Sequence, residues 1–141
     1  FENFDKSLLN DFTEIFIEGD DTELIFTSFT NITGDAKNNY KYKLLINSSK
    51  KIIAEVINKD ATASKYLVEH TIKYNLYNIK KNCKIFKKLI KTRNTYNAKS
   101  EGYSFGTDQS KEDAISQNIN KNINEFVSSL NVLKSWSDCM D

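Results

Sequence analysis

The chain contains no proline, one histidine, one arginine and four glycines among its 141 residues. With His70 as its single histidine, it has no paired-ligand metal motif, and it has neither a nucleophile elbow nor a glycine-rich phosphate loop. No apolar run approaches the ~20 residues that a membrane-spanning helix needs. The sequence therefore predicts a protein that is not an enzyme and that needs no metal or cofactor.

Cysteine is also scarce, since only Cys83 and Cys139 are present. Two cysteines are too few for a disulfide framework, and these two are too far apart for the spacing of metal ligands. The sequence is consistent either with one disulfide bond between them or with two free thiols.

Lysine and asparagine are abundant instead, with nineteen Lys and seventeen Asn, a bias typical of an AT-rich genome. Residues 1–25 contain eight acids against Lys6 alone, whereas residues 80–93 contain seven bases and no acid. Such asymmetry can orient an anionic partner toward the basic end, and the other interpretation is two solvated faces that attract each other.

Residues 61–97 are predicted to form one long β-hairpin. Every second residue from Tyr66 to Leu76 belongs to one largely apolar face, and the opposite face is half polar. The polar run at 80–82 predicts the turn, and a basic, β-rich return strand follows. His70 lies in the apolar register, so we expect a hydrogen-bonded core or interface histidine rather than a base or a metal ligand.

Before the hairpin, residues 1–11 are predicted to be a loose N-terminal segment. In residues 12–18, successive side chains alternate between two faces, which predicts a short strand. Asp20 or Asp21 is a candidate cap for a helix. The apolar face of that helix comprises Leu24, Ile25, Ser28, Phe29 and Ile32. A strand is the alternative, because this segment is rich in β-branched residues and phenylalanine.

Residues 33–39 have the composition of a loop. Strands are expected at 40–46 and 51–57, with a break at 47–49. A helix between two strands implies a right-handed crossover that places the two strands parallel in one sheet.

Residues 98–109 contain two glycines and are predicted to be a loop. Ser110 begins the clearest helix, because Ser110 and Asp113 form a capping box. Its core stripe comprises Ile115, Ile119, Ile123, Phe126, Val127, Leu130 and Leu133. Its polar face, expected to meet water or a polar partner, includes Asn118, Asn120, Asn122 and Asn124. Residues 134–141 form a tail without periodicity.

These elements predict a single domain, residues 1–141, of the α/β (α+β) class. Its architecture is a two-layer sandwich, in which two helices pack on one face of a mixed four-to-five-stranded sheet with a long β-hairpin.

The candidate site is the lysine cluster around the hairpin turn, which can neutralise phosphate groups of a lipid or of a nucleic acid. It comprises Lys80, Lys81, Lys84, Lys87 and Lys88. Nucleic acid is not the expected partner, because the helices cover one sheet face and no ribonucleoprotein-type motif is present. Strand alternation predicts that Lys84 and Lys88 lie on one face and that Lys81, Lys87 and Lys91 lie on the other.

The hairpin and the last helix carry a family resemblance. The matching positions are Ala63-Ser64-Lys65-Tyr66, Tyr74-Asn75-Leu76, Tyr96, Tyr103 and Ala114 to Leu130. With these positions, residues 60–130 resemble the core of the LPS-assembly lipoprotein (LptE) family. Residues 12–46 match that family in the order of elements only.

The resemblance implies a two-layer domain at the periplasmic face of the outer membrane of a Gram-negative bacterium. It implies a non-enzymatic LPS-assembly component that plugs the LPS translocon β-barrel, helps to assemble it and contacts LPS. The family is held to the membrane by a lipidated N-terminal Cys, which this chain does not contain and which we expect immediately before Phe1. On this interpretation the lysine cluster binds LPS phosphates.

The alternative is a secreted or surface protein-interaction domain of an AT-rich eukaryotic parasite, with Cys83 bridged to Cys139. The triplets at 31–33 and 47–49 match the glycosylation sequon, which suits that alternative. The precursor sequence discriminates between the two, because only the lipoprotein requires a lipobox Cys before Phe1.

Overall fold

The structure, a computed structural model, describes residues 13–33, 40–57, 59–60, 63–98, 104–130, 132–133 and 138–140. Its strands are β1 (Thr13–Gly19), β2 (Tyr42–Ile57), β3 (Ala63–Asn78) and β4 (Cys83–Asn97), and its helices are α2 (Thr22–Thr33) and α3 (Ser104–Leu130). The predicted N-terminal segment 1–11 lies outside the described residues, as do loop residues 34–39 and residues 134–137 and 141 of the predicted tail.

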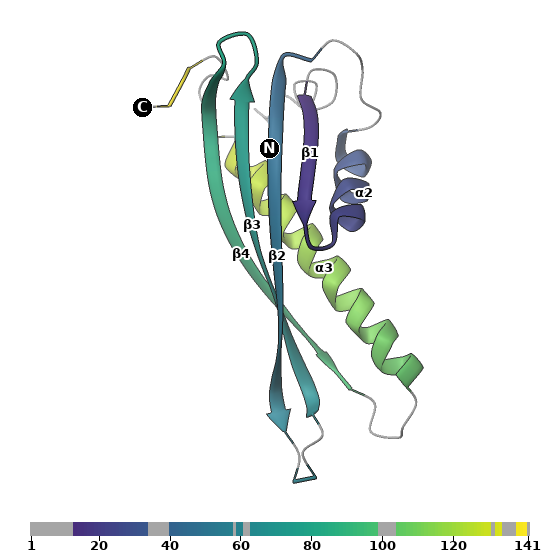
Figure 1. Cartoon of the computed structure of the whole chain (residues 1–141). Coiled ribbons are helices and arrows are strands. Elements are labelled where there is room, and N and C mark those ends of the chain that lie inside the picture. The colour runs from purple at the N-terminus through teal and green to yellow at the C-terminus, as the bar shows by residue number, and fades with distance from the viewer. Residues whose placement is uncertain are drawn as a thin grey trace.

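The strands form one sheet in the order β1-β2-β3-β4 (Figure 1). β1 is parallel to β2, and the other two pairs are antiparallel. Because α2 connects β1 and β2, both the predicted parallel pairing of these strands and the choice of helix over strand for this segment are confirmed. α3 runs diagonally behind the sheet in the view of Figure 1. The predicted two-layer α+β architecture with its long hairpin is confirmed.

The turn from β1 into α2 depends on one glycine. Gly19 has a φ of 103°, and a Cβ at this position would overlap the backbone carbonyl of Ser48 in β2. The next residue, Asp20, donates its backbone N–H to that same carbonyl at 2.9 Å. A side chain at position 19 would therefore separate the turn from β2, and glycine is required there.

The core lies between α3 and the sheet. The stripe of α3 faces it as predicted, since Ile115, Ile119, Ile123, Phe126 and Leu130 are buried and Val127 and Leu133 pack at its margin. The ring of Phe126 stacks on that of Tyr74 in β3, with centroids 4.1 Å apart and planes 5° apart. Phe29 of α2 meets the same phenylalanine edge-on at 6.3 Å, so one aromatic side chain joins both helices to the sheet.

The predicted polar face of α3 is wrong at two of its four asparagines. Asn118 and Asn122 are fully buried against the sheet, whereas Asn120 and Asn124 are exposed. The hydroxyl of Tyr74 donates to Oδ1 of Asn122 at 2.6 Å. Burial of these amides is tolerated because each forms hydrogen bonds with the strands beneath it.

The predicted break at 47–49 is also wrong, because β2 runs without interruption through these residues. Asn47 donates from Nδ2 to Oε1 of Glu18 on β1 at 2.9 Å, and Ser48 is buried. Polar residues that would favour a loop in isolation are held in the strand by pairing with β1 on one side and β3 on the other.

The last helix begins at Ser104, six residues before the predicted start at Ser110, so the predicted loop 98–109 is shorter than expected. Gln109 donates from Nε2 to Oδ1 of Asp113 at 3.1 Å, an i,i+4 pair of the kind that supports an exposed helix. The capping-box assignment is therefore wrong. Within the described residues, no helix combines the length and the apolar character needed to cross a membrane.

Candidate ligand-contact surface

Among the described residues, no helix covers the face of the sheet that points away from α3, and we call this the open face. On β3, the even-numbered residues from Val68 to Leu76 are buried toward the helix, so the odd-numbered residues point to the opposite, open face. Tyr77 lies on this face between two lysines, with Lys43 Nζ 5.4 Å and Lys84 Nζ 5.7 Å from its ring centroid. The open face therefore begins, near the β3–β4 turn, with an aromatic ring between two cations.

A β-bulge decides which lysines of β4 share this face. The register shifts between the pairs Leu76–Phe86 and Tyr77–Lys84, which leaves Ile85 without a partner on β3. Lys84 therefore lies opposite Tyr77 and Lys87 lies opposite Asn75, so both lysines belong to the open face. The prediction from simple alternation, which separated Lys84 from Lys87 and grouped Lys84 with Lys88, is wrong because it did not include the bulge.

The lysines of β4 line a hollow of about 580 Å³. It is lined by Lys73, Tyr74, Asn75, Lys84, Lys87, Lys88 and Leu89, and we call it the basic hollow. Among the described residues, no carboxylate lines it and none forms an ion pair with its lysines. Lys73, Lys84 and Lys87 lie on the open face, whereas Lys88 is the cross-strand partner of Tyr74, which points toward α3, so the side chain of Lys88 belongs to the opposite face. Three cations at one shallow depression favour an anionic ligand with more than one charge.

The structure brings together only part of the predicted lysine cluster. Lys84, Lys87 and Lys88 line the basic hollow, whereas Lys80 and Lys81 lie in the exposed turn and do not. A further cation that lines the hollow, Lys73, was missed by the sequence analysis. Its signal was its odd-numbered position on β3, which places it opposite Leu89 on the open face.

The rest of the basic strand has an acidic partner. Nε of Arg93 donates to Oε2 of Glu69 at 2.6 Å, and Lys91 Nζ is 4.0 Å from the other carboxylate oxygen. The hydrogen bond from Arg93 lowers the pKa of Glu69, and the charge of Lys91 adds to the effect. Two of the seven bases are thus engaged within the sheet and are not part of the candidate site.

A second hollow, of about 470 Å³, adjoins the basic hollow across the sheet. Its lining residues are Phe16, Ile17, Glu18, Leu45, Ile46, Asn47, Lys73 and Asn75, and we call it the apolar hollow. Lys73 and Asn75 line both hollows. The two hollows therefore share lining residues on the open face, with lysines over β4 and the apolar side chains of Phe16 and Leu45 over β1 and β2.

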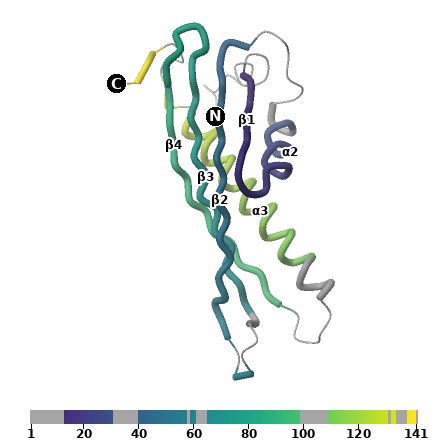
Figure 2. The backbone as a smooth tube through the Cα atoms, viewed as in Figure 1, coloured from purple at the N-terminus to yellow at the C-terminus, as the bar shows by residue number. Residues whose placement is uncertain are grey.

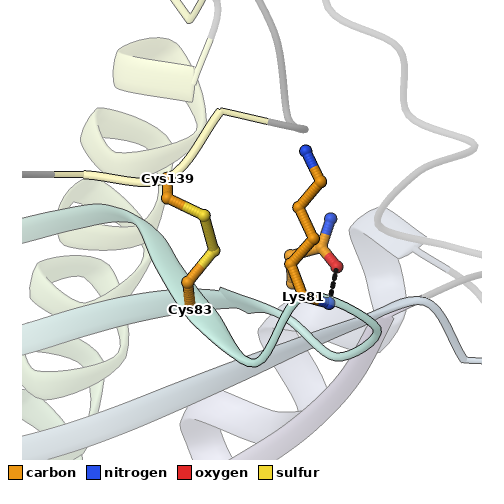
Figure 3. The surroundings of a disulfide bond; sticks show 4 residues. Lys81, Cys83 and Cys139 are labelled. Carbon is orange, nitrogen blue, oxygen red and sulfur yellow. Dashed lines mark hydrogen bonds between the residues drawn. A yellow bond between two sulfur atoms is a disulfide. The ribbon is translucent and has the colours of Figure 1, made fainter.

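A disulfide bond fixes the chain's C-terminal segment beside the turn. Cys83, the first residue of β4, is bonded to Cys139, with Cα atoms 5.8 Å apart (Figure 3). The backbone N–H of Met140 donates to the carbonyl of Lys84 at 2.8 Å. Residues 138–140 of the predicted tail are thus attached to β4, next to the first lysine of the basic hollow.

His70 is a core residue, as predicted. It is fully buried, and its Nε2 lies 2.9 Å from Oδ2 of Asp21 while its Nδ1 lies 2.7 Å from Nδ2 of Asn118. The same carboxylate group meets Lys50 Nζ at 3.0 Å through its other oxygen. Both ring nitrogens are engaged and screened from solvent, so the ring is not placed to exchange protons with a substrate.

Two positions that carry the family resemblance are packed together. Tyr66 of β3 and Tyr96 of β4 are cross-strand partners, and their rings stack with centroids 5.2 Å apart. Burial raises the pKa of Tyr96. The matched tyrosines therefore help to join the ends of the two hairpin strands.

No protein-family model matches the chain, and no curated protein matches it in sequence. Its fold, in contrast, is that of several solved bacterial structures. A candidate lipoprotein from Caulobacter crescentus superposes with a TM-score of 0.65 at 14% identity, covering 89% of this chain and 90% of that one. Rare lipoprotein B from Shewanella oneidensis superposes with a TM-score of 0.63 at 9% identity, covering 86% of this chain and 93% of that one.

A third similar structure is the minor lipoprotein of Acinetobacter baumannii, with a TM-score of 0.57 at 9% identity, covering 87% of this chain and 91% of that chain. All three are covered over nearly their whole length. The chain therefore has the fold of these bacterial lipoproteins.

Proposed function

We propose that this protein is a non-enzymatic component of LPS assembly at the periplasmic face of the outer membrane, where it contacts LPS and plugs the translocon β-barrel that it helps to assemble. Two independent lines support the proposal. Residues 60–130 resemble the LPS-assembly lipoprotein family in sequence, and the fold is shared with the lipoproteins named above. On this proposal an N-terminal lipid outside this chain anchors it.

The basic hollow is the observation that carries the proposed LPS contact. LPS bears phosphate groups on its lipid A portion, and several weak lysine contacts must converge before such a ligand is held. Lys73, Lys84 and Lys87 meet that condition on one face of the adjacent strands β3 and β4. Lysine ammonium groups suit phosphate as compact point charges without the planar geometry of arginine.

The surroundings of His70 support a binding role rather than catalysis. The only histidine of the chain is fully buried, and its hydrogen bonds join a turn, a strand and a helix. Within the part of the chain that the structure describes, no cluster of three His, Cys, Asp or Glu residues is placed to hold a metal ion.

The disulfide bond supports an oxidising cellular compartment for this protein. A bridge between Cys83 and Cys139 persists in oxidising surroundings such as the bacterial periplasm. The alternative, a secreted interaction domain of a eukaryotic parasite, also required this bridge. The fold shared with bacterial lipoproteins favours the periplasmic proposal.

Titration with purified LPS tests the contact. The triple variant Lys73→Gln, Lys84→Gln, Lys87→Gln should bind at least tenfold more weakly than the wild type, a loss of about 1.4 kcal/mol. Wild-type binding should also weaken between about 0.02 and 0.5 M salt, because exposed charges are screened within ~10 Å at 0.1 M.

The matched control removes three exposed lysines from the far end of the sheet, with Lys51→Gln, Lys59→Gln and Lys65→Gln. It changes the net charge by the same amount and should leave LPS binding unchanged. Equal weakening by both triple variants would contradict a localised contact and would indicate a general charge effect.

The barrel partnership needs a separate experiment. The full-length precursor should be expressed in its own cell type, extracted from the outer membrane in mild detergent and purified through a tag. Copurification of a large outer-membrane β-barrel in stoichiometric amount is expected. Recovery of the protein without such a barrel would contradict the plug function while leaving the LPS contact to its own test.

A further inference from the structure

The open face of the sheet changes from apolar to basic along a single row of cross-strand neighbours. Phe16 of β1 lies beside Leu45 of β2, which lies opposite Asn75 of β3, which lies opposite Lys87 of β4. Strands in a sheet are 4.7–4.9 Å apart, so this row spans roughly 15 Å from the phenylalanine to the lysine. Figure 1 shows these four strands side by side, with α3 behind them.

The two hollows follow the same gradient. The apolar hollow lies over the Phe16 end of the row and the basic hollow over the Lys87 end, and Asn75 lines both. Phe16 is 47% exposed, although it lies on a strand within a sheet that has a well-packed core on its other side. An aromatic ring left open to water beside a hollow is a surface at which burial of an apolar group is favourable.

Charge fixes the direction in which a ligand can lie. Glu18 lines the apolar hollow and accepts a hydrogen bond from Asn47 at 2.9 Å, so a carboxylate is held at that end. A phosphate there would meet the carboxylate of Glu18 as well as Lys73, whereas at the other end the charged lining residues, among those that the structure describes, are all lysines. The anionic part of a ligand therefore belongs over β4 and its uncharged part over β1 and β2.

We propose that the two hollows together form one site for a phosphorylated, acylated lipid that lies across the strands, with its phosphate at the basic hollow and one fatty acyl chain over Phe16 and Leu45. This inference rests on the proposed LPS contact and adds an acyl-chain subsite to it. A phosphate or a phosphorylated sugar alone fills only the basic hollow, because the apolar end is about three strand spacings away.

Three probes separate the two ends of the site: lipid A, its fully deacylated diphosphorylated disaccharide, and lipid A from which the phosphates have been removed. The test variant is Phe16→Asn, and the control is Ile57→Asn, which removes a 64% exposed apolar side chain from the far end of β2. Circular dichroism and melting temperature verify that both variants fold.

Phe16→Asn should weaken binding of lipid A roughly tenfold, as expected for loss of contact with a few methylene groups. It should leave binding of the deacylated disaccharide unchanged, and Ile57→Asn should change neither. Phe16→Trp provides a second readout that does not depend on stability. Its fluorescence should shift to shorter wavelength, relative to the wild type, when lipid A is added but not when the disaccharide is added.

The outcomes distinguish the acyl subsite from the phosphate contact. If lipid A binding requires Lys73, Lys84 and Lys87 but is unaffected by Phe16→Asn, the acyl subsite is wrong while the proposed LPS contact stands. If the disaccharide binds the wild type as tightly as lipid A does, the acyl subsite is also wrong. If no phosphorylated probe binds the wild type, both the subsite and the LPS contact are overturned.

Discussion

His70 and Asp21 form a side-chain contact of 2.9 Å that joins β3 to the turn between β1 and α2. The other nitrogen of the imidazole meets the amide of Asn118 on α3 at 2.7 Å. One buried ring therefore connects the edge of the sheet, its centre and the helix layer. These contacts fix the position of β1, which carries Phe16, relative to the lysines of β4.

Asn118→Ala should be strongly destabilising. The amide also donates to the carbonyl of Thr92 at 2.9 Å, so its removal leaves a ring nitrogen and a carbonyl buried without their donor. Such a loss costs about 1–3 kcal/mol. Urea denaturation should show that decrease. The control Asn124→Ala, at an exposed position on the same helix, should change stability by no more than about 0.5 kcal/mol. Equal effects would mean that α3 is rotated relative to the sheet.

Phe126→Ala should remove about 3–5 kcal/mol from the free energy of unfolding. The ring is fully buried and stacks on Tyr74 at a centroid distance of 4.1 Å, so truncation leaves a cavity and removes an aromatic pair. Ser128→Ala, at an exposed position on the same helix, is the control. A loss below 1 kcal/mol for the phenylalanine would contradict the packing of α3.

Replacing both cysteines by serine should lower stability by about 4 kcal/mol in the chain-entropy treatment, because the bridge closes a loop with a sequence separation of 56 residues. Differential scanning calorimetry of the oxidised wild type and the Cys83→Ser, Cys139→Ser variant measures the loss. Mass spectrometry of the native protein should find no free thiol, and two alkylatable cysteines would show that the bridge is absent.

The contact between Glu69 and Arg93 should make stability depend on pH. The pKa of Glu69 is lowered from its ordinary 4.5, so the contact contributes stability above that pH and loses it as the pH falls through the lowered pKa. Glu69→Gln should therefore lower the melting temperature near neutral pH. The difference from the wild type should shrink below about pH 4.5 and vanish in stronger acid. A difference that is constant with pH would show that the pair contributes only by packing.

Local patterns were sufficient to predict the elements whose residues agree with one another over many positions. The long hairpin followed from alternation between Tyr66 and Leu76. The helix assignment for α2 was correct, although the side chains of its candidate cap residues, Asp20 and Asp21, contact Lys50 and His70 instead. The prediction of a helix between the first two strands also led to the prediction that β1 and β2 are parallel, because a helix that connects two neighbouring strands of one sheet usually crosses over to a parallel strand.

The failures concern residues whose environment is set by distant partners. Asn118 and Asn122 look like surface residues in sequence, and they are buried only because strand carbonyls accept their amide hydrogens. Asn47 resembles a loop residue until Glu18 is placed beside it. The bulge at Ile85, which brings Lys84 to the face of Lys87, leaves no local sequence signal.

The central claim is that LPS lies against the basic hollow, and photo-crosslinking in cells that make LPS tests it most directly. A photoreactive amino acid placed at Lys87 should form an adduct with LPS on irradiation. Figure 2 shows the end of β2 and the start of β3 at the opposite end of the sheet from the turn between β3 and β4. The same amino acid at Lys59, an exposed position between β2 and β3 in the chain, should form none. Adducts at both positions, or at neither, in protein that is folded and correctly located, would contradict the assignment of LPS to this surface.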